Sequence, residues 1–174
     1  MTAPVDLSLD LYNWIRSAGL DMTQGSQTDD GRTVIWNKGG EVRYFVSYAD
    51  GYSTMTSSNR MAPERFHLSS STMPILEKYL YGRFGNSIRK QNGLGWVRKP
   101  CAIDELQQAY TIGKVTFYGR ERDALIDESG TVLAIGEIDR LVELSHYLGA
   151  PVSAIKDSFF NPQGKPLFSP LGER

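Results

Sequence analysis

The sequence predicts an α+β fold: mainly antiparallel β-meanders flanked by helices, with a C-terminal helical hairpin. Three observations support this prediction. Two blocks rich in β-branched and aromatic residues are divided by short turn signals, amphipathic stretches precede and separate the blocks, and two helical stretches follow the second block. A chain of 174 residues is the size of one domain, so we expect residues 1–174 to form a single domain.

The first half of the chain is predicted to contain a helix and then a meander. Apolar residues recur at helical spacing over Ser8–Ala18, and Gly19 suits the end of that helix. Strands joined by glycine-containing turns are predicted at Arg32–Asn37, Glu41–Tyr48 and Tyr52–Ser57. The even-numbered residues from Val42 to Tyr48 share one face of the middle strand, which predicts a sheet with one solvated side.

The second half is predicted to begin with a longer helix from Thr72 to Lys90. Gly82 and Gly85 weaken the prediction for the second part of this helix, because glycine is a poor helix former. Further strands are predicted at Lys114–Tyr118, Asp123–Ile126 and Thr131–Ile135. Two helices, Glu137–Leu148 and Pro151–Phe160, then form the predicted hairpin.

The composition disfavours two classes of partner. The net charge is -1, whereas proteins that bind nucleic acid or anionic membranes usually carry a clear positive excess. No run is apolar enough for a membrane span, and we expect no signal peptide, since the N-terminus lacks a basic and an apolar region. We therefore expect a cytoplasmic protein that binds neither nucleic acid nor membrane, and the single Cys101 agrees with a reducing compartment.

Residues that could perform catalysis or hold a cofactor follow no recognisable motif. His67 and His146 lack a metal-ligand partner three or four residues away, so we expect structural or surface roles for both. Cys101 lies in an unpatterned loop, and the adjacent carboxylates, such as Asp104-Glu105, are typical of solvated turns. We predict that the protein is not an enzyme and carries no cofactor or metal.

One alternative function comes from residues 137–160. Their two helices and the intervening Gly149 have the rhythm of a DNA-binding helix-turn-helix. A recognition helix should present several basic or amide side chains to DNA, but Pro151–Phe160 offers only Lys156. A packing hairpin is therefore the main interpretation, and a helix-turn-helix regulator is the alternative.

Aromatic and basic side chains could mark a protein interface. Most aromatic residues are expected in the core, but exposed ones would indicate a partner surface, because aromatic residues are frequent interface hot spots. Arg83, Arg89 and Lys90 form a basic end of the long helix, which we expect to be a solvated face or a contact for an acidic partner.

Several segments together resemble a family of bacterial immunity proteins from polymorphic toxin systems. The segments are Gly40–Val46, Glu77–Gly85, Ile88-Arg89 and Ser158–Phe168, the last with an Asn-Pro-x-Gly-x-Pro-Leu-Phe ending. One member of this family is the immunity factor for the mycobacterial tuberculosis necrotizing toxin, an NAD⁺ glycohydrolase. The matching residues are apolar and turn residues, which define a scaffold and perform no chemistry.

The resemblance implies an antitoxin that forms a one-to-one complex with a cognate toxin and blocks its NAD⁺ cleft. It does not identify the contact residues. A cleft that binds a diphosphate should be rich in hydrogen-bond donors, so the blocking loop should present acceptors or amides. Asp29-Asp30 fits this description, and our predicted toxin-binding residues are those of a second loop: Asp104, Glu105, Gln107 and Gln108.

Overall fold

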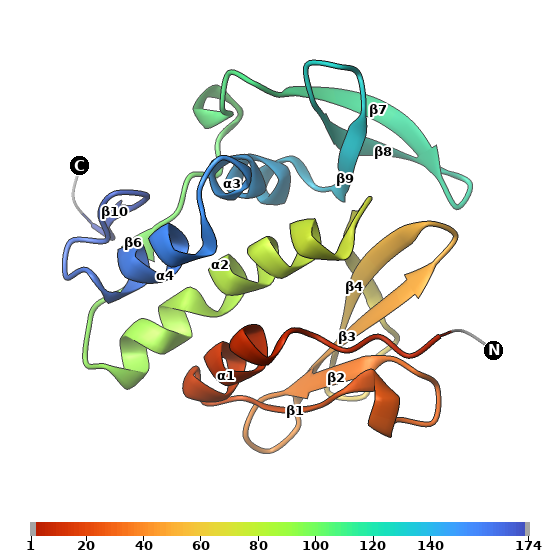
Figure 1. The fold of residues 1–174 in the computed structure, drawn as a ribbon, viewed down its shortest axis with the longest axis horizontal. Helices are drawn as coiled ribbons and strands as arrows, with labels where there is room; N and C mark the ends of the chain where they lie inside the picture. The colour runs from red at the N-terminus through yellow and green to blue at the C-terminus, as the bar shows by residue number, and fades with distance from the viewer. Residues whose placement is uncertain (1–2, 173–174) are drawn as a thin grey trace.

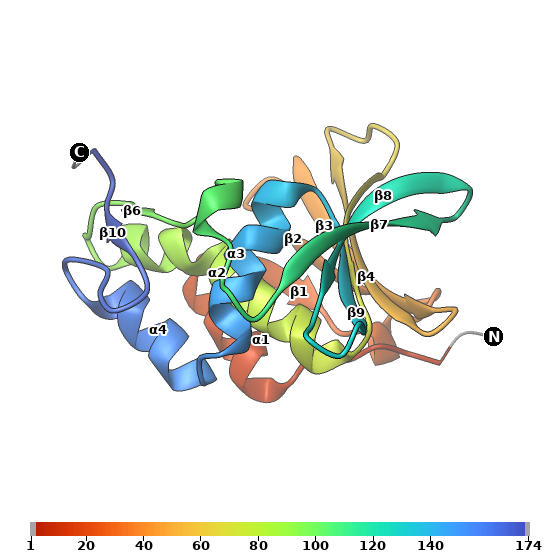
Figure 2. The ribbon, with the colours of Figure 1, turned by 90° about the horizontal axis from the view of Figure 1, so that it is seen from above.

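The computed structural model describes residues 3–172, which fold into a layer of helices packed on a curved sheet. Figure 1 shows α2 (Met73–Gln91) crossing the middle of the molecule, with α1 (Leu9–Ser17) on one side and α3 (Ile138–Leu148) on the other. Seen from above, the sheet lies on one side of these helices (Figure 2). The predicted α+β class is confirmed.

Within residues 3–172, eight strands form one antiparallel sheet in the order β1-β2-β3-β4-β5-β9-β8-β7. Their bounds are β1 Asp21–Thr23, β2 Thr33–Trp36, β3 Val42–Ala49, β4 Tyr52–Asn59, β5 Arg65–Ser70, β7 Thr111–Phe117, β8 Arg120–Ile126 and β9 Val132–Gly136. A separate pair joins β6 (Val97–Arg98) to β10 (Ser169–Pro170). Short 3₁₀ turns lie at Gly25–Gln27 and Ile103–Glu105.

The large sheet is strongly curled. Three strands separate β4 from the edge strand β7, which would place them almost 20 Å apart in a flat sheet with a spacing of about 4.8 Å. Yet the Phe117 ring of β7 lies 5.3 Å from the Tyr52 ring of β4, and the Tyr118 hydroxyl donates to Asp50 in the β3–β4 turn. The sheet therefore curls around a small second core built on Phe117, Ala124 and Ile135.

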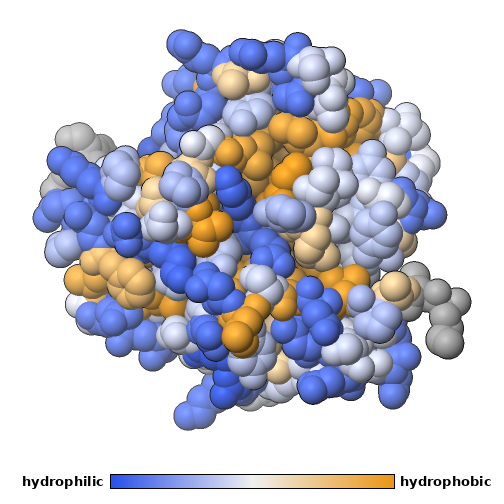
Figure 3. Space-filling model, viewed as in Figure 1, coloured by the Kyte–Doolittle hydropathy of each residue, from blue (hydrophilic) through white to orange (hydrophobic). Residues whose placement is uncertain are grey.

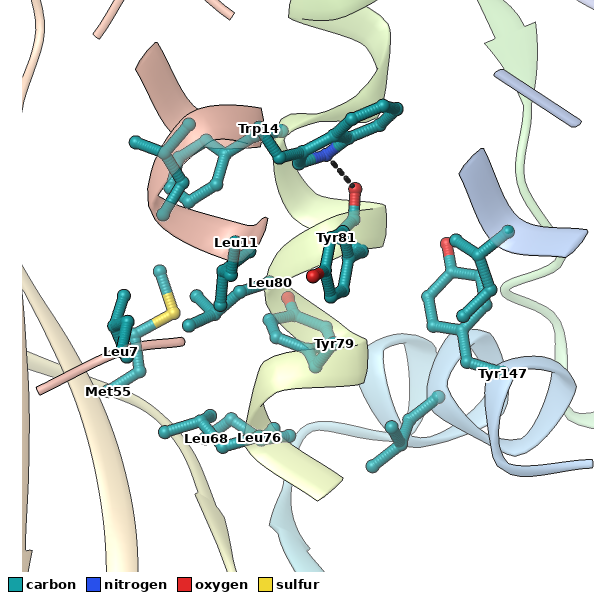
Figure 4. Packing of buried hydrophobic residues seen from close by; sticks show 14 of the residues in the cluster. Leu7, Leu11, Trp14, Met55, Leu68, Leu76, Tyr79, Leu80, Tyr81 and Tyr147 are labelled. Atoms are coloured by element: carbon teal, nitrogen blue, oxygen red, sulfur yellow. Dashed lines mark hydrogen bonds between the residues drawn. The ribbon is translucent and has the colours of Figure 1, made fainter. Parts of the chain in front are cut away.

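The main core lies between the sheet and the helices. Figure 4 shows α1 and α2 packed through Leu11 and Leu80, with Met55 and Leu68 of the sheet beside them. The Trp14 indole Nε1 donates to the Tyr81 carbonyl at 3.0 Å, so even this polar atom has a partner in the core. Burial of this apolar stripe, more than helix propensity, stabilises the two helices.

The long helix continues through both of its glycines. A Cβ at Gly82 would lie 2.2 Å from Cε2 of Tyr147, and one at Gly85 would lie 2.1 Å from Cζ of Phe159. Both rings are fully buried. The glycines are therefore the places where α3 and α4 (Val152–Phe160) approach α2 most closely, which explains why helix propensity is sacrificed there.

The C-terminal helices form the predicted packing hairpin. On α4, Ile155 and Phe159 are buried, and α2 is its main neighbour. Lys156, the basic residue of this helix, donates to the Asp10 carboxylate of α1 at 3.0 Å. These contacts support the interpretation of residues 137–160 as a packing element.

The basic end of α2 differs from the prediction of a solvated or partner-binding face. Arg89 is only 2% exposed, and its guanidinium donates to the carbonyls of Phe159 at 2.9 Å, Asn161 at 2.6 Å and Pro162 at 3.0 Å, as well as to Gly95. The carbonyls of Phe159, Asn161 and Pro162 belong to the end of α4 and the following turn, where carbonyls lack intrahelical partners. Arg89 thus caps α4 from inside the protein, where the negative end of the helix dipole favours a cation.

Several boundaries differ from the sequence expectations. The short strand β1 lies outside the predicted strands, and β8 begins at Arg120 rather than Asp123. The charged residues at the start of β8 make this strand difficult to recognise in the sequence. In the structure, Lys114 pairs with Asp123 across the exposed face of the hairpin. In β3, Tyr44 and Val46 are buried as the alternation predicts, whereas Tyr48 at the end of the strand is 49% exposed.

Candidate functional site

The loop that contains the four predicted toxin-binding residues is held in a defined shape by its own carboxylate. The Arg98 guanidinium donates to both Glu105 oxygens, at 2.9 Å and 2.6 Å. The same carboxylate accepts from the Ala102 backbone N–H at 3.2 Å. These bonds close residues 98–105 into a compact turn around the Ile103–Glu105 3₁₀ segment.

Helix α3 holds the other side of this loop. His146 Nε2 donates to the Glu105 carbonyl at 2.7 Å, because a carbonyl can only accept. His146 Nδ1 then accepts from Gln107 Nε2 at 2.9 Å, and the Gln107 backbone N–H donates to Ser145 Oγ at 3.3 Å. The prediction of a structural role for His146 is in agreement with these contacts.

The four residues separate into two groups by exposure. Glu105 is half-buried, and the Arg98 hydrogen bonds, with those from the Ala102 and Cys101 N–H groups, lower the pKa of its carboxyl to about 2. Asp104, Gln107 and Gln108 are exposed. Glu105 therefore maintains the shape of the loop, and Asp104 and Gln108 present a carboxylate and an amide to solvent. Gln107 is exposed as well, but its Nε2 also donates to His146.

The loop also exposes one large apolar side chain. Ile103, directly before Asp104, is 55% exposed. On the face drawn in Figure 3, apolar residues gather in several separate patches among hydrophilic ones. Interfaces commonly combine such apolar contacts with a polar rim. The second loop with paired carboxylates has a similar arrangement, since Asp30 pairs with Arg32 at 2.8 Å while Asp29 is exposed.

The partners that order the loop could not be read from the sequence. Arg98 lies seven residues before Glu105, and Ser145 and His146 lie about forty residues after it. One local signal for the turn is present in the sequence. Glu105 lies three residues after Ala102, and this spacing allows its carboxylate to accept a hydrogen bond from the Ala102 backbone N–H.

The two histidines and Cys101 lie in different elements of the described chain. No group of three or more His, Cys, Asp and Glu side chains in residues 3–172 could hold a metal ion. Cys101 is exposed in the loop just described, and His67 lies on β5, remote from it in sequence. None of the helices in this part is long and apolar enough to cross a membrane.

His67 is a buried neutral imidazole. It is 9% exposed, and its Nε2 lies 2.8 Å from the Tyr79 hydroxyl. Burial, together with the positive charges of Arg140, Arg83 and Lys99, lowers the pKa of His67 to about 3. Its place in the hydrogen-bonded core agrees with the structural role predicted from the sequence.

This pKa predicts acid sensitivity. Below about pH 6.5 the unfolded chain binds a proton at His67 that the folded protein excludes, so stability falls as the pH drops toward 3. Between pH 6.5 and 5 the loss from this group should be about 1.7 kcal/mol, because the slope reaches about 1.4 kcal/mol per pH unit only once the unfolded imidazole is mostly protonated. Urea unfolding of wild type and His67→Gln at both pH values checks this prediction. An equal decrease in the free energy of unfolding of the two proteins between pH 6.5 and 5 would contradict it.

Comparisons with known proteins agree on a family. Residues 14–167 match the family model of Immunity protein 61. The chain is 55% identical over 169 residues to "Immunity factor for TNT" of Mycobacterium tuberculosis (strain ATCC 25618 / H37Rv) and to "Immunity factor for TNT homolog" of Mycobacterium bovis (strain BCG / Pasteur 1173P2). In both cases the alignment covers 97% of this chain and 96% of the relative.

A solved structure has the same fold. "Rv3902c from M. tuberculosis" superposes with a TM-score of 0.95 at 53% sequence identity, covering 99% of both chains. The segments that suggested a resemblance to toxin-immunity proteins lie within or directly beside the matched region. The chain belongs to the Immunity protein 61 family.

Proposed function

We propose that this protein is a cytoplasmic antitoxin that binds a secreted NAD⁺ glycohydrolase one to one and obstructs its active site. Membership of an immunity-protein family and 55% identity to an "Immunity factor for TNT" support a toxin as the partner. Tuberculosis necrotizing toxin is an NAD⁺ glycohydrolase, so a related toxin is the proposed target. In this role the protein inhibits the toxin by filling its active site and catalyses no reaction itself.

The observation that carries the proposal is the ordered loop with exposed Asp104, Gln107 and Gln108. Its Arg98–Glu105 and His146 contacts fix its shape before binding, which lowers the entropy lost on association. A cleft that binds a dinucleotide diphosphate needs hydrogen-bond donors. Carboxylate and amide oxygens on a fixed loop can accept hydrogen bonds from those donors in place of phosphate oxygens.

The direct test is NAD⁺ consumption by a tuberculosis-necrotizing-toxin-type domain, titrated with this protein. We expect activity to fall linearly and to end near one equivalent, as for a tight inhibitor. Undiminished hydrolysis at large excess, without co-elution of the two proteins, would contradict the proposed target.

The contact loop is tested by a triple variant, Asp104→Ala with Gln107→Ala and Gln108→Ala. Truncation of interface hot spots should weaken the complex by about 100-fold or more. Glu128→Ala is the control, since Glu128 is an exposed carboxylate in the turn between β8 and β9. Equal affinities of the triple variant and wild type, measured by calorimetry, would place the interface elsewhere.

A further inference from the structure

A polar cleft of about 550 Å³ lies apart from the loop described above. It is formed by the β3–β5 part of the sheet, by α2 and by the start of α3. Its lining includes seven residues with aromatic, basic or acidic side chains: Tyr44, Arg65, Phe66, His67, Arg83, Glu137 and Arg140. These residues come from β3, β5, α2 and the start of α3, so the cleft exists only in the folded protein.

The cleft concentrates positive charge in a protein whose net charge is -1. Three guanidinium groups and one carboxylate line it. Among residues 3–172, neither Arg65 nor Arg83 has a carboxylate within 4 Å. The Glu137 carboxylate is 71% exposed and lies 3.8 Å from Arg140 Nη2, so it neutralises the site only weakly.

The two arginines contributed by helices are positioned by hydrogen bonds and keep donors free. Arg83 Nη2 donates to the Tyr44 hydroxyl at 2.9 Å, and Arg140 Nη1 donates to the His67 carbonyl at 3.0 Å. A guanidinium has five N–H donors, so most of them remain available. Arg83 Nε is buried with no hydrogen-bond partner among the described residues, a costly state for a charged group.

Two further features favour an anion in this position. The α3 helix begins at Ile138, next to the cleft residue Glu137, and a helix N-terminus carries partial positive charge. His67 remains neutral beside Arg83 and Arg140, so the positive charge comes from guanidinium groups. Planar guanidinium forks match the geometry of carboxylate and phosphate groups, where they form paired hydrogen bonds.

We propose that this cleft is an oxyanion-binding site that takes a carboxylate or phosphate group between Arg65, Arg83 and Arg140. The group has two possible sources: a small free anion, or an acidic side chain of the toxin. The second source rests on the proposed function and would give the complex a contact separate from the Asp104–Gln108 loop.

Two-dimensional NMR of the arginine Nε–Hε signals tests the site without any toxin. Titration with inorganic phosphate, and separately with N-acetylglutamate, should shift the Arg83 signal saturably. Arg83→Gln should weaken binding of the probe by about tenfold, because a hydrogen bond to a charged group is lost. Arg65→Gln should weaken it by about threefold at this exposed position, while Glu137→Gln should strengthen it.

The matched control is Arg120→Gln, which removes one positive charge from the exposed start of β8, outside the cleft. We expect it to bind both probes as wild type does. If Arg120→Gln weakens binding of the probes as much as Arg83→Gln does, affinity depends on net charge alone and the proposed site is wrong.

The toxin arm distinguishes the two sources. If wild type binds the toxin domain, a shift of the Arg83 signal in the complex and weaker binding by Arg65→Gln would identify a toxin carboxylate. Binding of phosphate or N-acetylglutamate with an unaltered toxin complex would identify a free anion. If wild type does not bind the toxin, the proposed function fails. Phosphate and N-acetylglutamate alone then decide whether the cleft binds an oxyanion. An Arg83 signal unmoved by every ligand that is tested overturns the proposal.

Discussion

Substitution of Gly85 by alanine is expected to destabilise the protein by about 3 kcal/mol, because the added methyl group overpacks the core. The new Cβ would lie 2.1 Å from the buried Phe159 ring. Alanine favours helix by up to about 1 kcal/mol over glycine, so the clash must exceed this gain. Urea unfolding monitored by circular dichroism measures the difference.

Gly149→Ala is the matched control for this prediction. Gly149 ends α3 with a negative φ, and a Cβ there would have no neighbour within 4 Å. The double variant Gly85→Ala with Phe159→Leu tests the cause, since a smaller side chain at position 159 should return part of the lost stability. A Gly85→Ala protein as stable as wild type would mean that α4 can move away from α2 without cost.

Substitution of Arg89 by methionine is expected to cost about 3–5 kcal/mol, because one buried and three part-buried carbonyls lose a charged donor at once. The acceptors are the carbonyls of Gly95, Phe159, Asn161 and Pro162. Methionine fills a similar volume, so the loss should reflect hydrogen bonding more than a cavity. The damage should be local to the end of α4 and the turn after it.

Hydrogen exchange across residues 158–168 measures this local effect, alongside global urea unfolding. The exchange rates and the stability of Arg89→Lys should lie between those of wild type and Arg89→Met. An ammonium group keeps the charge, but it has three donors in place of the planar guanidinium fork. Lys90→Met is the control, because the adjacent side chain is exposed. Unchanged exchange rates in Arg89→Met would show that the carbonyls find other donors.

The two glycines show how local pattern and tertiary structure compete. From the sequence, Gly82 and Gly85 weaken a helix, and nothing near them indicates that Tyr147 and Phe159 occupy the space above. Contacts between residues more than sixty positions apart have no periodic signature in one chain. The helix was still predicted correctly, because its apolar stripe is a local property.

The candidate site shows the same division. Asp104, Gln107 and Gln108 were selected as polar loop residues, and they are exposed. Glu105 was selected with them, yet its Arg98 contact makes it the residue that shapes the loop. The Arg83 cleft was visible only as a basic helix end, since Tyr44, Arg65 and Arg140 come from other elements.

The α+β class, the main helices and meanders and, through the scaffold segments, the immunity-protein family can be inferred from the amino-acid sequence alone. These depend on periodicity and turn residues, which act over a few positions of the chain. The curl of the sheet, the role of Arg89 as an internal cap and the three arginines that line one cleft become visible in the folded protein. Each of these depends on side chains distant in sequence, whose meeting is fixed by packing of the whole core.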